Sequence, residues 1–285
     1  MSATTAERTT SQVGGSRLAW AVQDSLVVMR RNLLRFVRIP ALFVFSIVQP
    51  IMFVLLFRYV FGGNIKNLPP GLNYVNFLMP GIFVQTAIFG ATNTGIGLAE
   101  DLGAGIVDRF RSLPMARSAV LMGRTLSDLM RNLVVVLLMV GIGYLVGFSF
   151  SDGLLAAVAA VLLTVSIGFA FSWVSATIGL AIKNVESVQA ASFTWIFPLT
   201  FVSSALGSTA GFPSFLQGIA RNNPVTIWAN AVRTLTVGSV NIGGRQFLPP
   251  PGEGLSGLIL KSTVWIALIL IAFVPIAVRT YRKIT

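Results

Sequence analysis

Histidine and cysteine are both absent from this chain of 285 residues, and only 9 side chains are acidic. Without cysteine the chain forms no internal disulfide and offers no thiolate to a metal ion. Without histidine no serine has an imidazole base to activate it, and the acids show no spacing typical of a metal site. The sequence therefore argues against hydrolytic and metal-dependent chemistry, and we expect no cofactor to be held by this chain.

A nucleotide-binding loop is also missing from the sequence. The pair Lys261-Ser262 is preceded by Leu260 and by no GxxxxG, which a phosphate-binding loop requires. Charged residues inside the apolar stretches, which proton- or sodium-coupled carriers need, reduce essentially to Arg58. Arg58 can extend to the external membrane surface, and we favour this over a role in a substrate site. A secondary transporter is therefore disfavoured, and any transport must draw its energy from another protein.

Apolar residues make up 54% of the chain and charged residues only 11%, with a mean hydropathy of +0.80. Several charge-free stretches reach the roughly 20 apolar residues that cross a bilayer as a helix. The sequence predicts an all-α, polytopic membrane protein in which residues 17–285 form one domain after a disordered cytoplasmic tail, residues 1–16. The six transmembrane helices are expected at about 39–61, 77–99, 132–150, 154–182, 188–207 and 258–278.

The Lys and Arg residues are unevenly distributed between the two sides of this arrangement. Most of the 21 precede the first span, lie between spans two and three, or follow the sixth. Because basic residues accumulate on the cytoplasmic side, we expect both termini in the cytoplasm, in the plasma membrane of a bacterial cell. The net charge of +12 would also suit nucleic acid, but these charges adjoin spans, where they attract lipid headgroups. We therefore expect membrane lipids, and no nucleic acid, as partners.

Two segments outside the spans carry patterns of their own. Residues 18–38 place apolar side chains at spacings of three and four, with arginines on the other side. This predicts an amphipathic helix in the cytoplasmic interface, either as a plain anchor or also as a docking surface for a cytoplasmic partner. Residues 208–257 hold two apolar segments too short to span, broken by Pro213 and Pro224, which predict short external re-entrant helices.

The densest polar segment is EDLGAGIVDRFRSLPMARS, residues 100–118, between spans two and three. Asp101 and Asp108 are seven residues apart, so a helix would place them on one face, and Pro114 marks a helix stop. The segment is either a solvated loop that obeys the positive-inside rule or a short helix held by a soluble partner. We favour the helix, because a plain connecting loop does not require this pattern.

Aromatic residues crowd the fifth span. The plainest role for them is packing or contact with lipid. The alternative is an apolar gate that faces a substrate path, and the residues named for it are Phe193, Phe197 and Phe201.

Three segments in this order resemble those of type-2 ATP-binding-cassette (ABC) exporter permeases, specifically the daunorubicin-resistance-like branch. They are LLFRYVFGG at residues 55–63, the polar segment at residues 100–117, and NPVTIWANAVR at residues 223–233. Arg58 is an unusual occupant of the first segment. The resemblance covers nearly the whole chain beyond Ser16.

The resemblance implies a six-helix permease that is not itself an enzyme. It would pair with a second permease, identical or homologous, and with two copies of a separate cytoplasmic ABC ATPase that binds ATP and magnesium. The first intracellular loop would form a coupling helix on that ATPase. Carried onto this chain, the coupling residues are Asp101, Gly105, Asp108, Arg109, Phe110, Arg111, Leu113 and Pro114.

The resemblance further implies export of a hydrophobic or amphipathic molecule, a drug, natural product or lipid, from the cytoplasm or inner leaflet, as in antibiotic efflux. A permease for lipid-linked polysaccharide is the alternative within the family. It should display polar and aromatic side chains along its path, and the spans show little beyond Phe and scattered Ser and Thr. A membrane-embedded enzyme or assembly protein without an ATPase partner is the alternative from another class, and a channel fits less well.

Overall fold

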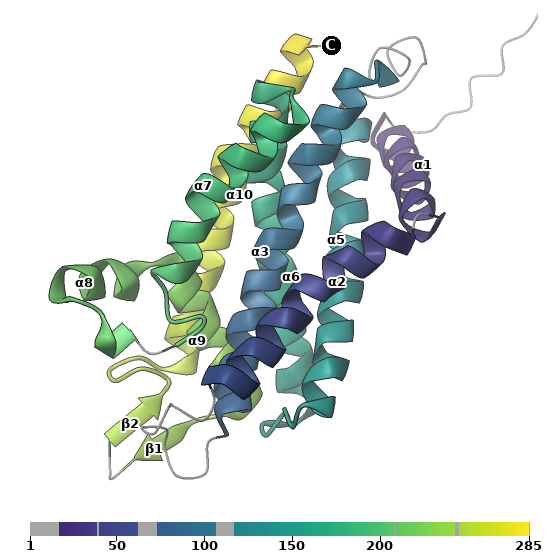
Figure 1. Ribbon diagram of the computed structural model, residues 1–285. Helices are drawn as coiled ribbons and strands as arrows, with labels where there is room; N and C mark the ends of the chain where they lie inside the picture. The colour runs from purple at the N-terminus through teal and green to yellow at the C-terminus, as the bar shows by residue number, and fades with distance from the viewer. Residues whose placement is uncertain are drawn as a thin grey trace, which may run out of the picture.

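The computed structural model describes residues 17–38, 40–61, 73–106, 117–207, 209–242 and 245–284. Almost all of the described chain is helical (Figure 1). The expected tail, residues 1–16, lies outside the described residues. The helices and strands are α1 (Arg17–Arg38), α2 (Pro40–Leu55) with a π-helical extension (Leu56–Phe61), α3 (Tyr74–Gly103), α5 (Arg117–Leu145), α6 (Gly153–Ile182), α7 (Val185–Phe201), a 3-10 turn (Thr209–Gly211), α8 (Ser214–Asn222), α9 (Pro224–Val237), β1 (Val240–Ile242), β2 (Arg245–Leu248) and α10 (Leu255–Ile284).

The predicted all-α, polytopic class is confirmed. Each of the six expected spans coincides with a helix, namely α2, α3, α5, α6, α7 and α10. Among the described residues, 4 helices are long and apolar enough to cross a membrane: α3, α5 from Leu121, α6 and α10. Helix α7 is 17 residues long and the apolar part of α2 is shorter, so the number of six spans stays a prediction.

Several expected boundaries differ from the structure, most of all that at the start of the third span. The third span was expected at residues 132–150, but α5 begins at Arg117 and ends at Leu145. It therefore incorporates Arg124 and Arg131, which the charge count assigned to a cytoplasmic loop. At the other end Gly147 adopts a φ of 95°, a left-handed conformation that favours glycine and stops the helix. Helix α7 likewise ends at Phe201 rather than near residue 207, and Pro198 precedes that end.

Helix α3 is the centre of the bundle. It packs most extensively against α6 and also contacts α2, α5, α7 and α9, and Figure 1 shows it running between α5 and α7. Small residues permit the closest approach, because a Cβ atom on Gly179 of α6 would lie 2.3 Å from the Gly95 carbonyl oxygen of α3. Ser175 joins the same two helices, since its hydroxyl donates to the Thr92 carbonyl and accepts from the Gly95 amide, each at 3.0 Å.

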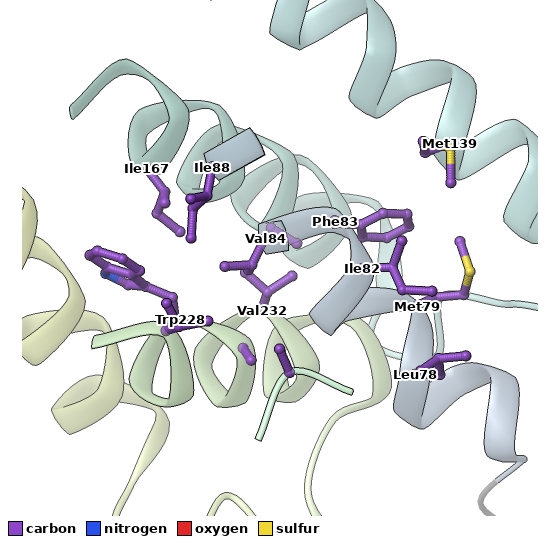
Figure 2. Packing of buried hydrophobic residues seen from close by; sticks show 14 of the residues in the cluster. Leu78, Met79, Ile82, Phe83, Val84, Ile88, Met139, Ile167, Trp228 and Val232 are labelled. Carbon is purple, nitrogen blue, oxygen red and sulfur yellow. The ribbon is translucent and has the colours of Figure 1, made fainter. Parts of the chain in front are cut away.

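The external helices predicted at residues 208–257 are present as α8 and α9, and they differ in burial. Trp228 and Val232 of α9 are fully buried and face Val84 and Ile88 of α3 (Figure 2). Helix α9 is therefore covered by protein, as an irregular segment at membrane depth requires. Helix α8 packs on α9 and leaves Phe215 70% exposed.

A small antiparallel hairpin follows α9 and was not predicted. Strands β1 and β2 pair with Asn241 opposite Gln246. The hairpin folds back on the start of α3, where the Phe247 and Phe77 ring centroids lie 6.4 Å apart. Strands of 3 and 4 residues are too short for alternation to stand out. The Gly243-Gly244 pair between them is the sequence signal that could have indicated a hairpin.

The close contact of α3 with α6 predicts that a methyl group added at this contact lowers the stability of the protein, whereas one added elsewhere does not. Gly179→Ala should destabilise the protein by about 1–3 kcal/mol, because backbone atoms of α3 must shift to admit the Cβ atom. Gly141→Ala on α5 is the matched control, since no atom lies within 4 Å of its Cβ position. Thermal unfolding in detergent should show a lowered midpoint for Gly179→Ala only. Equal midpoints for the two variants would contradict the packing described for α3 and α6.

Candidate functional site

The two described members of the predicted coupling set lie together at the end of α3. Asp101 is 4% exposed on its last turn. Gly105 follows the helix with a φ of 65°, a conformation that favours glycine, and its amide donates to the Leu102 carbonyl at 3.2 Å. Gly105 therefore turns the chain two residues after α3 ends at Gly103. The other members lie outside the described residues: Asp108, Arg109, Phe110, Arg111, Leu113 and Pro114.

Asp101 belongs to a buried network of charges between α3 and α5. Arg124 donates to Asp101 at 3.2 Å, and its Nε lies 3.8 Å from Asp128. Arg131 binds the other Asp128 oxygen at 3.0 Å, and the Thr94 hydroxyl donates to Asp128 at 2.5 Å. The expectation that Arg124 and Arg131 lie in the loop between spans two and three is therefore wrong. Asp101 on α3 and Asp128 on α5 neutralise the two arginines, which allows both arginine side chains to be largely buried.

Glycine makes room for this network within α3. A Cβ atom on Gly97 would lie 1.3 Å from Nη2 of Arg124, so the guanidinium occupies the space that a side chain would take. About two turns earlier, the Gly90 carbonyl accepts from Arg131 at 2.9 Å. The arginines of α5 thus lie directly against the backbone of α3, and the two helices are fixed in one register.

Helix α1 joins the same end of the bundle. Val28 is 2% exposed against α5, and a Cβ atom on Gly123 would lie 2.6 Å from the Ser25 carbonyl oxygen. Asn32 donates to Ser127 at 3.4 Å, and Arg31 lies 3.8 Å from Asp101. These contacts attach α1 to the helices that carry the charge network, and both roles left open for the amphipathic segment stay predictions.

A cavity of about 330 Å³ opens between α2, α3, α5 and α7, above this network along α3. Aromatic rings form part of its wall, from Phe53, Phe89 and Phe193. The remainder is largely polar. Its polar residues are Gln49, Gln85, Thr86, Thr92, Asn93, Arg131, Asn132 and Gln189.

Sequence reasoning missed this cavity. The statement that the spans show little beyond Phe, Ser and Thr is wrong for its wall, which carries amides from α2, α3, α5 and α7. No local pattern reveals them, because the amides come from four different helices of the chain. Only the packing of these helices brings the amides together.

The three phenylalanines proposed as a gate form one row with Phe89. Centroid distances are 6.0 Å from Phe89 to Phe193, 5.5 Å from Phe193 to Phe197, and 5.8 Å from Phe197 to Phe201. Phe193 lines the cavity, whereas Phe197 and Phe201 are 41% and 47% exposed on α7. The row therefore leads from the polar cavity to the apolar surface of the subunit.

At the opposite end of α3, near Phe77, Arg233 of α9 is 1% exposed. It donates to the carbonyls of Phe77 at 2.8 Å and Ser204 at 2.9 Å and to Asn230 at 2.8 Å, and its guanidinium stacks 3.8 Å from the Phe77 ring centroid. Burial lowers the pKa of Arg233 to about 9, which still leaves it charged at neutral pH. The three hydrogen bonds compensate for this buried charge.

Asn223, at the start of the same segment, caps α9 by accepting from the Val225 amide at 2.8 Å. Its amide nitrogen donates to the carbonyls of Leu199 and Val202 at 2.7 Å each. Asn223 and Arg233 are the first and last residues of the NPVTIWANAVR segment. That segment therefore holds the end of α7 and the start of α3 in place.

A bundle of apolar helices with an internal polar cavity defines a membrane transport permease. The chain belongs to the ABC-2 type transporter family, whose model matches residues 24–236. It is 31% identical over 265 residues to the daunorubicin resistance ABC transporter permease protein DrrB1 of Streptomyces coeruleorubidus, with 93% of this chain and 88% of that protein covered. It is also 28% identical to the "Probable doxorubicin resistance ABC transporter permease protein DrrC" of Mycobacterium tuberculosis, over 76% of this chain and 78% of the relative. The chain is a multi-pass transmembrane permease of an ABC exporter, and its relatives are permease subunits rather than enzymes.

The charge network predicts that replacing one partner of an ion pair costs more stability than replacing both partners together. Arg124→Leu should cost about 3–5 kcal/mol, because Asp101 is left buried without its nearest partner. The double variant Arg124→Leu/Asp101→Leu should be less destabilised than the sum of the two single variants. Denaturant unfolding of the detergent-solubilised protein measures both effects.

Glu186→Gln serves as the control for loss of a charge, since Glu186 is an exposed acid at the start of α7. It should change stability by less than about 1 kcal/mol. If Arg124→Leu were no more harmful than this control, the buried network would have no structural role.

Proposed function

We propose that this permease exports a hydrophobic or amphipathic molecule, and that a separate cytoplasmic ABC ATPase drives it. The assembly contains two ATPase copies, which bind ATP and magnesium, and a second permease, identical or homologous to this one. Support comes from membership of the ABC-2 type transporter family and from relatives that are named for resistance to daunorubicin and doxorubicin. Family membership also favours a permease over a membrane-embedded enzyme or assembly protein.

The single observation that carries the proposal is the course of α3. One buried helix of 30 residues has Asp101 at one end, the cavity residue Gln85 in its middle, and Phe77 near its other end. An ATPase that moved the Asp101 end would therefore act on the cavity through a continuous helix. This arrangement suits a permease that receives mechanical work in the cytoplasm and uses it within the membrane.

The coupling surface in this proposal is the segment that follows α3. Phe110 and Leu113 supply an apolar anchor for the ATPase, while Asp101, Asp108 and the arginines of the set give register and specificity. Gly105 sets the direction in which the segment leaves α3. Helix α1 supports the same contact, since it packs on α5 beside the charge network.

The orientation in this proposal places both termini and the coupling segment in the cytoplasm of a bacterial cell, and α8, α9 and the hairpin on the external side of the plasma membrane, with the two helices dipping into its outer leaflet. The uneven distribution of basic residues supports it. The exposed phenylalanines of the α7 row then face lipid or a second permease. In this arrangement, the row is the apolar side of the substrate path.

Gly105 offers a sharp test of the coupling role. Gly105→Ala should lower ATP-driven transport severalfold, because alanine resists the left-handed backbone at this residue by roughly 1–2 kcal/mol. Gly103→Ala is the matched control: it lies two residues earlier within α3, and its Cβ position is equally open. The measurement is ATP-dependent export from proteoliposomes together with retention of the ATPase on the purified permease.

Asp108→Lys and Phe110→Ala extend the same assay into the segment itself, with Lys66→Ala as an external control. Both should lose transport and ATPase retention, whereas all variants should still insert in the membrane. Normal transport and normal retention in Gly105→Ala, Asp108→Lys and Phe110→Ala would reject the coupling role.

A further inference from the structure

Gln85 is the feature of the cavity that packing does not explain. Its side chain is 3% exposed and lines the cavity from the middle of α3. Neither its amide nitrogen nor its amide oxygen has a hydrogen-bond partner among the described residues. An unpartnered carboxamide destabilises a buried position, and leucine would fill nearly the same volume without that penalty. The position thus places an unpartnered donor and an unpartnered acceptor at the cavity wall, within reach of a ligand by a change of side-chain rotamer.

Several other residues of the wall, which also carries apolar side chains, have the same chemical character. Gln49, Thr86, Asn93 and Gln189 add further uncharged donors and acceptors. None of the described residues that line the cavity is acidic, and Arg131 is neutralised by Asp128 at 3.0 Å. A cation that entered would meet one guanidinium and no carboxylate. The wall therefore favours a ligand that forms several hydrogen bonds and carries no positive charge.

We propose that this cavity binds the uncharged, hydroxyl-rich headgroup of an amphipathic molecule, of the size of a sugar ring. The volume of about 330 Å³ is at the lower end of ligand pockets and suits one such ring rather than a whole drug or lipid. The apolar tail lies along the row of Phe193, Phe197 and Phe201 toward the subunit surface. This assignment rests on the proposed export function and names its substrate class, uncharged glycosides and glycolipids.

Selectivity follows from the environment of Gln85. In a site with little water, a headgroup that satisfies both amide atoms removes their desolvation penalty, whereas a trimethylammonium group satisfies neither. The cavity should therefore discriminate between amphipaths that share one tail and differ only in the headgroup.

Photolabelling of the full-length permease in nanodiscs, without ATPase, tests the assignment. One probe is octyl β-D-glucoside with a diazirine in its alkyl chain, and the other is octyltrimethylammonium with the same chain. The glucoside should label α3 and the Phe193–Phe201 row at least about fivefold more than the cation does, and excess octyl glucoside should compete. Equal labelling by both probes, or labelling that does not compete, would overturn the proposal.

Gln85→Leu and Gln85→Met provide the critical variants. Each should reduce glucoside labelling at least about fivefold, yet unfold at an equal or higher temperature, since the unpartnered amide is gone. Gln23→Leu, an exposed glutamine of α1, should change neither quantity. Undiminished labelling in both Gln85 variants would overturn the assignment. Because no ATPase is present, that failure would leave the coupling measurements on Gly105 unaffected, and the two proposals fail separately.

Discussion

The burial of α3 on every side is the constraint on which the rest of the structure depends. Its most apolar window is 89% buried, against 39% for α6 and 11% for α10. Three kinds of contact hold it along its length: the Phe77 carbonyl on Arg233, the glycine contact with α6, and the ion pair of Asp101 with Arg124. Sliding or rotation of α3 alone would break these contacts. Movement of one end of α3 must therefore also move the helices that it contacts.

The buried charges connect α1, α3 and α5 at one end of the bundle. Arg124 and Arg131 on α5 bind Asp101 of α3 and Asp128 of α5 itself, and Arg31 brings α1 to the same end. Buried ion pairs contribute little net stability, but loss of one partner is costly. Their effect here is to fix the register of α1, α3 and α5 at the end from which the proposed coupling segment leaves α3. The opposite end of α3 is held by a single arginine, Arg233, which donates to the carbonyls of Phe77 and Ser204 and has no acidic partner among these contacts.

Much of this fold could be predicted because the bilayer restricts which sequences can cross it. A helix that crosses a bilayer must be long and apolar, so the spans and the amphipathic α1 could be located from composition and periodicity. Arg124 and Arg131 were placed in a loop because a count of charges cannot register that Asp101 and Asp128 neutralise them within the helices. The hairpin was too short for its pattern to show. The cavity could not be predicted, because Gln49, Gln85 and Gln189 come from three helices that only tertiary packing brings together.

The central claim is that α3 moves as one rigid helix that transmits work from the ATPase to the cavity. Spin labels on Asn73→Cys and Gly103→Cys of the cysteine-free chain span α3 across Pro80, about 45 Å apart at 1.5 Å per residue. Pulsed electron paramagnetic resonance with the partner ATPase should show this distance unchanged on addition of ATP. The distance from Gly103→Cys to Glu186→Cys of α7, by contrast, should change. A change of several Å within α3, or no change in either distance, would contradict the account.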